Sequence, residues 1–254
     1  MIRREVFGGL VFDEATHKIF TLDRPSFRVM ELGFIQGKDV AGIQSELISQ
    51  FDEDWSETMI NEALQTAQAR LGKSVMSQRG RTDNEIWTGQ WHGQYFSAPV
   101  SNFWSFTNLC NLHCEHCAWN SHRPLPNELN TAQCIQLIDD MLDMGVCELS
   151  FSGGEPLTKK AQLLAMAQHG HELGFCLGLA TNATMIDPTT ADELRHVGIR
   201  EVQVSFEGLE AHDSIRGRGV LERTFKGVQV LRDHGFDLTF SVTINKTNLA
   251  ELDN

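Results

Sequence analysis

The sequence of 254 residues has no long apolar run and few basic residues. A membrane-spanning helix needs about 18 consecutive apolar residues, and no such run occurs. The amino terminus, MIRREVFGGL, also has no apolar run of about 7 residues of the kind that follows the basic residues of a secretory signal. Lys and Arg total 21 against 34 Asp and Glu, so most of the surface repels a phosphate backbone. We therefore expect a soluble, cytoplasmic protein with no membrane and no nucleic-acid partner.

Cysteine is also scarce, and its distribution is uneven. Six cysteines in a chain of this length are too few for a disulfide scaffold, which indicates a reducing compartment and a role in metal binding or catalysis. Half of them lie in CNLHCEHC, residues 110 to 117, as Cys110, Cys114 and Cys117. The others lie in helical or strand patterns, where a free cysteine is commonly a small buried apolar residue: Cys134, Cys147 and Cys176.

The pattern of strands and helices in residues 1 to 75 predicts a small winged-helix-like α+β domain. Two segments, EVFGGLVFD and HKIFTLD, are typical of short strands, and three helical patterns follow. The second helical pattern has Asp39 as its expected N-cap and Ile48 on its apolar face, and the third opens near Ser56 with Met59 on that face. Residues 76–98 mix glycine, polar and aromatic residues without a sustained period, so we expect a linker there.

Residues 99–254 alternate strand and helix patterns, which is typical of parallel β/α units. The predicted strands are NFWSFTN, VCELSFS, FCLGLAT, EVQVSFE and LTFSVTI. The helical patterns between them end at glycines, as left-handed caps require: Gly145, Gly174, Gly198 and Gly235. The second, fourth and fifth strands alternate apolar with small polar residues. If helices cover the apolar faces, the polar faces line a cavity; the alternative is an ordinary sheet with one face in solvent.

The cysteine motif follows the first of these strands, at the end where barrel enzymes hold their active sites. A structural zinc site would need a fourth ligand, which His113, His116 or His122 could supply, but the two separated ligand pairs usual for zinc are not present. A 4Fe-4S cluster held by three thiolates instead leaves one iron open for a cofactor. This motif alone leaves both readings open.

A second motif, SGGEP at residues 152–156, follows the second predicted strand. Adjacent glycines let a backbone approach a ligand closely, and the carboxylate could face a cation, although Gly-Gly and Glu-Pro are also common turn pieces. The two motifs in this order resemble those of the radical S-adenosylmethionine (radical SAM) enzymes. The resemblance implies an α/β fold, a partial (β/α)6 radical SAM barrel with about five strands present, preceded by the small winged-helix-like domain.

The resemblance extends through TNAT, VSFEGLEAHDSIRG and TINKTNLAEL, with two departures: His116 stands where the family often has an aromatic residue, and Glu207 where it usually has Asp. It implies a 4Fe-4S cluster on Cys110, Cys114 and Cys117, with S-adenosyl-L-methionine chelated to the open iron. The residues implied to bind this cofactor are Gly153, Gly154, Glu155, Asn182, Ser205, Glu207 and Arg216.

The resemblance also implies the chemistry. An electron donor such as flavodoxin or ferredoxin would drive reductive cleavage of S-adenosylmethionine to a 5′-deoxyadenosyl radical. No catalytic residue is expected beyond the cluster and the cofactor. Thiolates are soft donors suited to iron, and a lined cavity can orient a substrate and exclude water.

The segment GGLVFDEATHKIFTLD with its three helices resembles the PqqD-like elements of SPASM-type peptide maturases. Such elements bind the leader of a precursor peptide as an added strand. The third helix has no basic stripe, which disfavours DNA binding. Two alternatives stay open: a radical SAM maturase of a protein or small cofactor, of the sulfatase or haem-pathway type, and a non-enzymatic iron–sulfur or zinc module that senses redox state.

The sequence stops at NKTNLAELDN, soon after the fifth predicted strand. A six-unit barrel needs a further helix, strand and helix, and maturases of the resembled type often have an additional cysteine-rich domain with auxiliary clusters. We therefore expect that the C-terminal part of the protein is missing from this chain; the alternative is that another chain or an unusual arrangement closes the cavity.

Overall fold

A computed structural model describes residues 2–5, 7–13, 18–51, 55–71, 78–79 and 96–251. The chain divides into two compact units, residues 1–100 with 140–147, and residues 101–139 with 148–254. The predicted linker over 76–98 lies mostly outside the described residues.

The first unit contains a four-stranded sheet in the order β3-β2-β1-β4, in which β1 and β2 pair antiparallel. Its elements are β1 (Ile2–Glu5), β2 (Gly8–Asp13), β3 (Lys18–Asp23), α1 (Arg24–Met30), the π-helical η1 (Glu31–Ile35), α2 (Val40–Phe51), α3 (Glu57–Leu71) and β4 (Gln78–Arg79).

The prediction of a single strand over EVFGGLVFD was wrong at its amino-terminal end, because residues 2–5 form a separate strand. All four residues of β1 are buried, so the strand shows no alternation of apolar and polar residues. Its charged side chains are tolerated because they are paired: Arg3 lies 2.7 Å from Glu5, and Arg4 lies 2.6 Å from Glu31. A search for alternating hydrophobicity does not detect such a strand.

The helices of the first unit begin where the sequence predicts. The Asp39 carboxylate accepts a hydrogen bond from the Gly42 N–H at 2.8 Å, which is the geometry of an N-cap. The core is formed by fully buried residues of α1, η1, α2 and α3: Val29, Leu32, Ile43, Leu47 and Ile60. Ile48 and Met59, both expected on the apolar faces, are each 48% exposed, because they lie at the margin of these faces.

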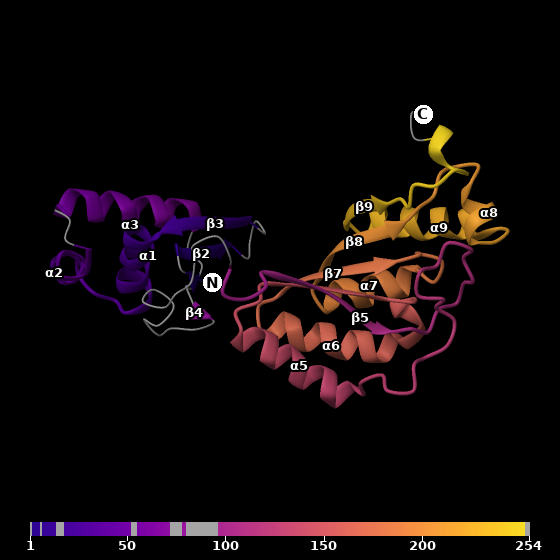
Figure 1. Cartoon of the computed structure of the whole chain (residues 1–254), viewed down its shortest axis with the longest axis horizontal. Helices are drawn as coiled ribbons and strands as arrows, with labels where there is room; N and C mark the ends of the chain where they lie inside the picture. The colour runs from indigo at the N-terminus through magenta and orange to yellow at the C-terminus, as the bar shows by residue number, and fades with distance from the viewer. Residues whose placement is uncertain are drawn as a thin grey trace. The chain divides into compact units, whose positions relative to one another are not determined.

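The second unit contains a parallel sheet of five strands in the order β5-β6-β7-β8-β9, which confirms the predicted fold class (Figure 1). Its elements are β5 (Ser101–Thr107), α5 (Thr131–Asp143), β6 (Glu148–Gly153), η2 (Pro156–Lys159), α6 (Lys160–Glu172), β7 (Cys176–Thr181), α7 (Pro188–His196), β8 (Ile199–Ser205), α8 (His212–Arg216), α9 (Val220–Asp233), β9 (Asp237–Ser241) and η3 (Leu249–Glu251). No helix in the described part of the chain has the length and apolar character needed to span a membrane.

The two faces of this sheet differ as the alternation predicts. Leu149, Phe151, Val202 and Val204 are fully buried. The intervening residues line two cavities on the opposite face, Ser152 and Ser205 in one and Ser150 and Gln203 in the other. The edge strand β9 differs: Phe240 is 52% exposed, and Ile244, which follows the strand, is 65% exposed. Their expected burial was wrong, because the described residues do not cover this edge.

The helix ends also follow the prediction. Gly145, Gly174, Gly198 and Gly235 have φ values of 83°, 83°, 86° and 74°. Asp187 caps α7 through a hydrogen bond of 2.7 Å from the Thr190 N–H. These local signals fix where each helix stops and the next strand begins.

Two helical glycines give a test of the packing. A Cβ at Gly227 would lie 2.1 Å from the Ala183 carbonyl oxygen, whereas a Cβ at Gly170 would lie 3.2 Å from the movable Leu177 side chain. We expect Gly227→Ala to reduce the free energy of unfolding by about 1–3 kcal/mol, because α9 must move away from the backbone. Gly170→Ala should be neutral or stabilise by up to about 1 kcal/mol, because alanine favours helix. Urea unfolding followed by circular dichroism measures both, and equal effects would contradict this packing.

Candidate active site

The three motif cysteines lie in the loop that follows β5, and all three line one cavity of about 280 Å³ at the carboxyl ends of the strands. None of them forms a disulfide, and each is partly exposed. The cavity is also lined by residues from the ends of β6, β7 and β8, among them Gly153, Asn182 and Ser205. The sequence-predicted cysteines are therefore brought together.

The cysteine thiols differ in their surroundings. Burial raises the pKa of the Cys110 and Cys114 thiols above the ordinary value. Burial also acts to raise the pKa of Cys117, but hydrogen bonds from the backbone of Ser121 and its neighbours outweigh it, so that this pKa is lowered. The Ser121 N–H lies 3.4 Å from the Cys117 sulfur.

The SGGEP loop packs directly against the segment that leads to Cys110. A Cβ at Gly153 would lie 2.1 Å from the Thr107 carbonyl oxygen, and one at Gly154 would lie 2.4 Å from that of Leu109. The Gly154 N–H donates to Thr107 O and the Glu155 N–H to Leu109 O, each at 2.8 Å. Both glycines line the cavity, but the contact that excludes a side chain is with the protein's own backbone.

Glu155 is placed differently from its expected position beside a cation. Its side chain is fully buried and is not among the residues that line the cavity. The carboxylate accepts hydrogen bonds from the Thr181 hydroxyl at 2.9 Å, from the Asn182 N–H at 2.8 Å and from the Leu157 N–H at 3.1 Å. Burial raises the pKa of Glu155, and these hydrogen bonds oppose the rise. Its carboxylate therefore joins the end of β6 to the end of β7.

Asn182 lines the cavity, but its side chain is held by protein partners that the sequence did not reveal. Its Nδ2 donates to Asn111 Oδ1 at 2.9 Å, and its Oδ1 accepts from the Thr184 N–H at 2.9 Å. Asn111 follows Cys110 directly, so this network ties the cysteine loop to the end of β7. In the sequence, the only sign of this contact is that Asn111 directly follows Cys110. That position alone does not predict Asn182 as its partner.

Ser205 ends β8, Glu207 follows it, and Arg216 ends α8. Ser205 and Arg216 line the cavity, whereas Glu207 is fully buried behind Arg216. The Glu207 carboxylate accepts from Arg216 Nη2 at 2.5 Å and from the Thr243 N–H at 3.1 Å, and it lies 3.2 Å from His116 Nε2. Desolvation lowers the pKa of His116, and the nearby Glu207 acts in the opposite direction. The two departures from the resembled family, His116 and Glu207, are therefore in contact with each other.

The side chains around the cavity can be compared with the two metal sites that the motif allows, a zinc ion and a 4Fe-4S cluster. Among the described residues, no group of three or more His, Cys, Asp and Glu side chains converges to hold a single metal ion. Two of the three histidines proposed for zinc have other polar partners, since His116 pairs with Glu207 and His122 Nδ1 lies 2.8 Å from Asn120 O. A cluster binds each cysteine through a different iron, so its thiolates surround a volume without meeting at a point. Three thiols around one cavity fit that requirement.

The second unit thus has a parallel β/α sheet with a cavity at the carboxyl ends of its strands, and thiols line this cavity. This arrangement is that of a partial-barrel enzyme. The sequence model of the Radical SAM superfamily matches residues 104–254. The chain belongs to this family, which uses a 4Fe-4S cluster and S-adenosylmethionine.

The curated relatives include enzymes with different names. An AdoMet-dependent heme synthase of Methanosarcina barkeri is 38% identical over 160 residues, which are 61% of this chain and 46% of that protein. Mycofactocin maturase MftC of Mycobacterium tuberculosis is 34% identical over 161 residues, 61% of this chain and 40% of that protein. The chain spans less than half the length of these relatives.

Among solved structures, Streptococcus suis SuiB bound to S-adenosylmethionine matches 100% of this chain and 58% of its own, with a TM-score of 0.64 and 19% identity. A second SuiB structure, bound to the precursor peptide SuiA, matches with the same TM-score and 18% identity. At this identity the likeness shows a shared fold.

The buried hydrogen bonds of Glu155 can be tested with a pair of threonines that are each 3% exposed, Thr181 and Thr190. Thr181→Val removes the hydroxyl that donates to the Glu155 carboxylate, so we expect the free energy of unfolding to fall by about 1–3 kcal/mol. Thr190→Val leaves Glu155 untouched and should cost less, because the partners of the Thr190 hydroxyl, Lys160 and Asp187, are accessible to water. Chemical denaturation of both variants provides the comparison. A smaller loss for Thr181→Val than for Thr190→Val would show that Glu155 does not depend on this hydroxyl.

Proposed function

We propose that this chain forms the peptide-recognition and radical-generating parts of a cytoplasmic radical SAM maturase that modifies a ribosomally made peptide. The observation that carries the proposal is the combination of a thiol-lined cavity in the second unit with an apolar groove beside an edge strand in the first. The likeness to SuiB supports it, because it covers the whole chain and one SuiB structure has a bound precursor peptide. A flavodoxin or ferredoxin is the proposed electron donor.

In this proposal Cys110, Cys114 and Cys117 hold the 4Fe-4S cluster. When bound, the cluster and S-adenosylmethionine supply a 5′-deoxyadenosyl radical for hydrogen abstraction. The other cavity residues orient the cofactor: the backbone of Gly153 and Gly154 lies beside the cysteines, and Arg216 presents a cation to the cavity. Glu155 and Glu207 act indirectly, since both carboxylates are fully buried and bonded to protein groups.

Arg216 is well suited to bind a carboxylate of the cofactor. A guanidinium has five N–H donors, and Glu207 accepts from its Nε and Nη2. The fixed geometry of this pair orients the guanidinium before the cofactor arrives, and Ser205 adds a hydroxyl on the same wall. Asn182, held by Asn111 and Thr184, presents a rigid polar surface rather than a mobile side chain.

The first unit has the features needed to bind an extended peptide. Among the residues that the structure describes, β3 is an edge strand of its sheet, and Ile19 on it is 38% exposed. Beside it, Phe20 and Leu22 of β3 and residues of α3 line a groove of about 380 Å³ whose wall is mainly apolar. A peptide added to β3 would gain backbone hydrogen bonds from the strand and apolar contacts from the groove. Met59, which is 48% exposed, lines this groove.

The second candidate function is a haem-pathway reaction on a tetrapyrrole. It is favoured by the 38% identity to an AdoMet-dependent heme synthase. That similarity covers 61% of the chain, whereas the likeness to SuiB covers all of it. Peptide binding by the first unit separates the two candidates, because a tetrapyrrole enzyme has no need of a leader-binding edge strand.

The cluster assignment is tested by electron paramagnetic resonance on the anaerobically reconstituted, reduced chain. We expect a 4Fe-4S signal that changes when S-adenosylmethionine is added, because the cofactor ligates the open iron. Cys114→Ser should lose most of the bound iron, whereas Cys134→Ser, a buried cysteine outside the cavity, should keep it. Zinc in place of iron, or equal iron in both variants, would reject the assignment.

The groove is tested by substituting two apolar residues of similar size and equal exposure, one methionine and one isoleucine. Met59 lines the groove and Ile48 does not, and both are 48% exposed. With labelled candidate leader peptides as the probe, we expect Met59→Glu to weaken binding about 10-fold or more, because a charge replaces an apolar contact. Ile48→Glu should bind like the original chain. Fluorescence anisotropy of a labelled peptide measures both, and equal affinities would place the peptide elsewhere.

A further inference from the structure

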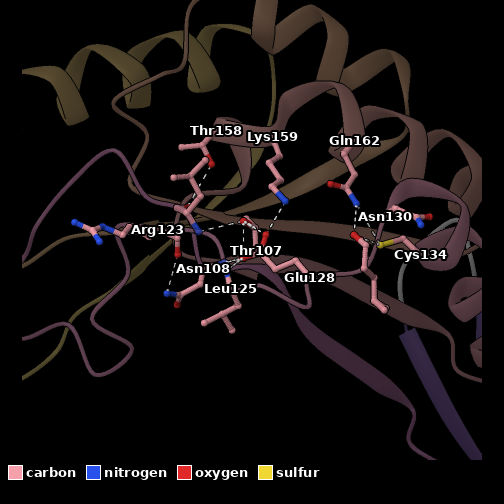
Figure 2. Close-up of polar contacts among 12 residues, drawn as sticks. Thr107, Asn108, Arg123, Leu125, Glu128, Asn130, Cys134, Thr158, Lys159 and Gln162 are labelled. Atoms are coloured by element: carbon pink, nitrogen blue, oxygen red, sulfur yellow. Dashed lines mark hydrogen bonds and ion pairs between the residues drawn. The ribbon is translucent and has the colours of Figure 1, made fainter.

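Glu128 lies in the loop between the cysteine motif and α5, and it does not line the cysteine cavity. Its carboxylate accepts hydrogen bonds from the Asn108 N–H at 2.6 Å, the Leu125 N–H at 2.9 Å and the Thr107 hydroxyl at 3.1 Å. Lys159 Nζ lies 2.6 Å from the same carboxylate (Figure 2). One side chain thus joins the end of β5, the loop before α5 and the end of η2.

The surroundings of Glu128 keep it charged. Its side chain is only 8% exposed. Burial acts to raise its pKa, but the hydrogen bonds from the Asn108 N–H, Lys159 and Leu125 outweigh burial and lower the pKa to about 2. A partly buried carboxylate with this many donors is a strong, directional acceptor for the backbone that it binds.

Asn108 links Glu128 to the cysteines at both ends of the motif. It lies two residues before Cys110, and its own side chain contacts the loop that follows Cys117. Its Oδ1 accepts from the Ser121 hydroxyl at 3.0 Å, and its Nδ2 donates to the Arg123 carbonyl at 3.2 Å (Figure 2 shows the latter). The Ser121 N–H in turn lies 3.4 Å from the Cys117 sulfur.

We propose that Glu128, paired with Lys159, is a positioning residue for the iron–sulfur cluster. It fixes Thr107 and Asn108 ahead of Cys110 and, through Asn108 and Ser121, places an N–H donor on the Cys117 sulfur. This inference rests on the proposed function, because it requires that the three cysteines hold the cluster. Hydrogen bonds to cluster sulfurs help to set the reduction potential, and groups that orient metal ligands affect retention of the metal.

The test compares Glu128→Gln with Glu193→Gln in the full chain after anaerobic reconstitution. Glu193 is a matched control, because it pairs at 2.7 Å with Lys160, the residue next to Lys159, and contacts none of the residues of the cysteine loop described above. We expect Glu128→Gln to lose iron to a chelator about 10-fold faster and to shift the midpoint potential of the cluster, because the donor to Cys117 is displaced. Glu193→Gln should behave like the original chain in both measurements.

A second variant decides the matter if Glu128→Gln does not fold, as judged by circular dichroism. Asn108→Ala keeps the Ser121 side chain and the Glu128–Lys159 pair, and it removes the amide oxygen that accepts from the Ser121 hydroxyl, so it should also shift the potential. A folded Glu128→Gln or Asn108→Ala chain that matches the original in iron retention and potential overturns the inference. An original chain that takes up no cluster would instead refute the proposed function on which the inference rests.

Discussion

The arrangement of the site depends on one buried carboxylate. Glu155 receives donors from the end of β7 while its own backbone is bonded to the segment after β5, so three neighbouring strand ends are fixed by a single residue. In an interior of low polarity these hydrogen bonds are strong, and leaving them unmade is costly. The loops that start from these strands, one with the cysteines and one with Asn182, therefore begin from a rigid base.

Local features of this fold could be read from the sequence, because each depends on neighbouring residues. Strand alternation, the glycines at helix ends and the Asp39 and Asp187 caps are of this kind. The contact between His116 and Glu207 could not be read in this way, since it joins a loop after β5 to the end of β8. Nor could the direction of the Glu155 side chain, whose partners Thr181 and Asn182 lie at the end of a different strand, β7, and directly after it.

The cavity wall shows how burial and charge are balanced. Glu207 is fully buried, and an isolated charge there would be very costly. Arg216 offsets that cost by direct pairing, and His116 offers a further donor. Glu128 and Lys159 repeat the same principle on the other side of the cysteine loop. A buried ion pair on one side and a partly buried one on the other thus give the loop a defined geometry that apolar packing alone would leave less specific.

The exposed strand β9 has a consequence for handling the protein. Within the described residues β9 pairs on one side only, with β8, while Phe240 and Ile244 are largely exposed. An edge with free backbone groups and apolar side chains is a template for another chain. At high concentration the 254-residue polypeptide should therefore self-associate or precipitate through this edge, and a charged or proline substitution in β9 should improve its solubility without touching the thiol-lined cavity.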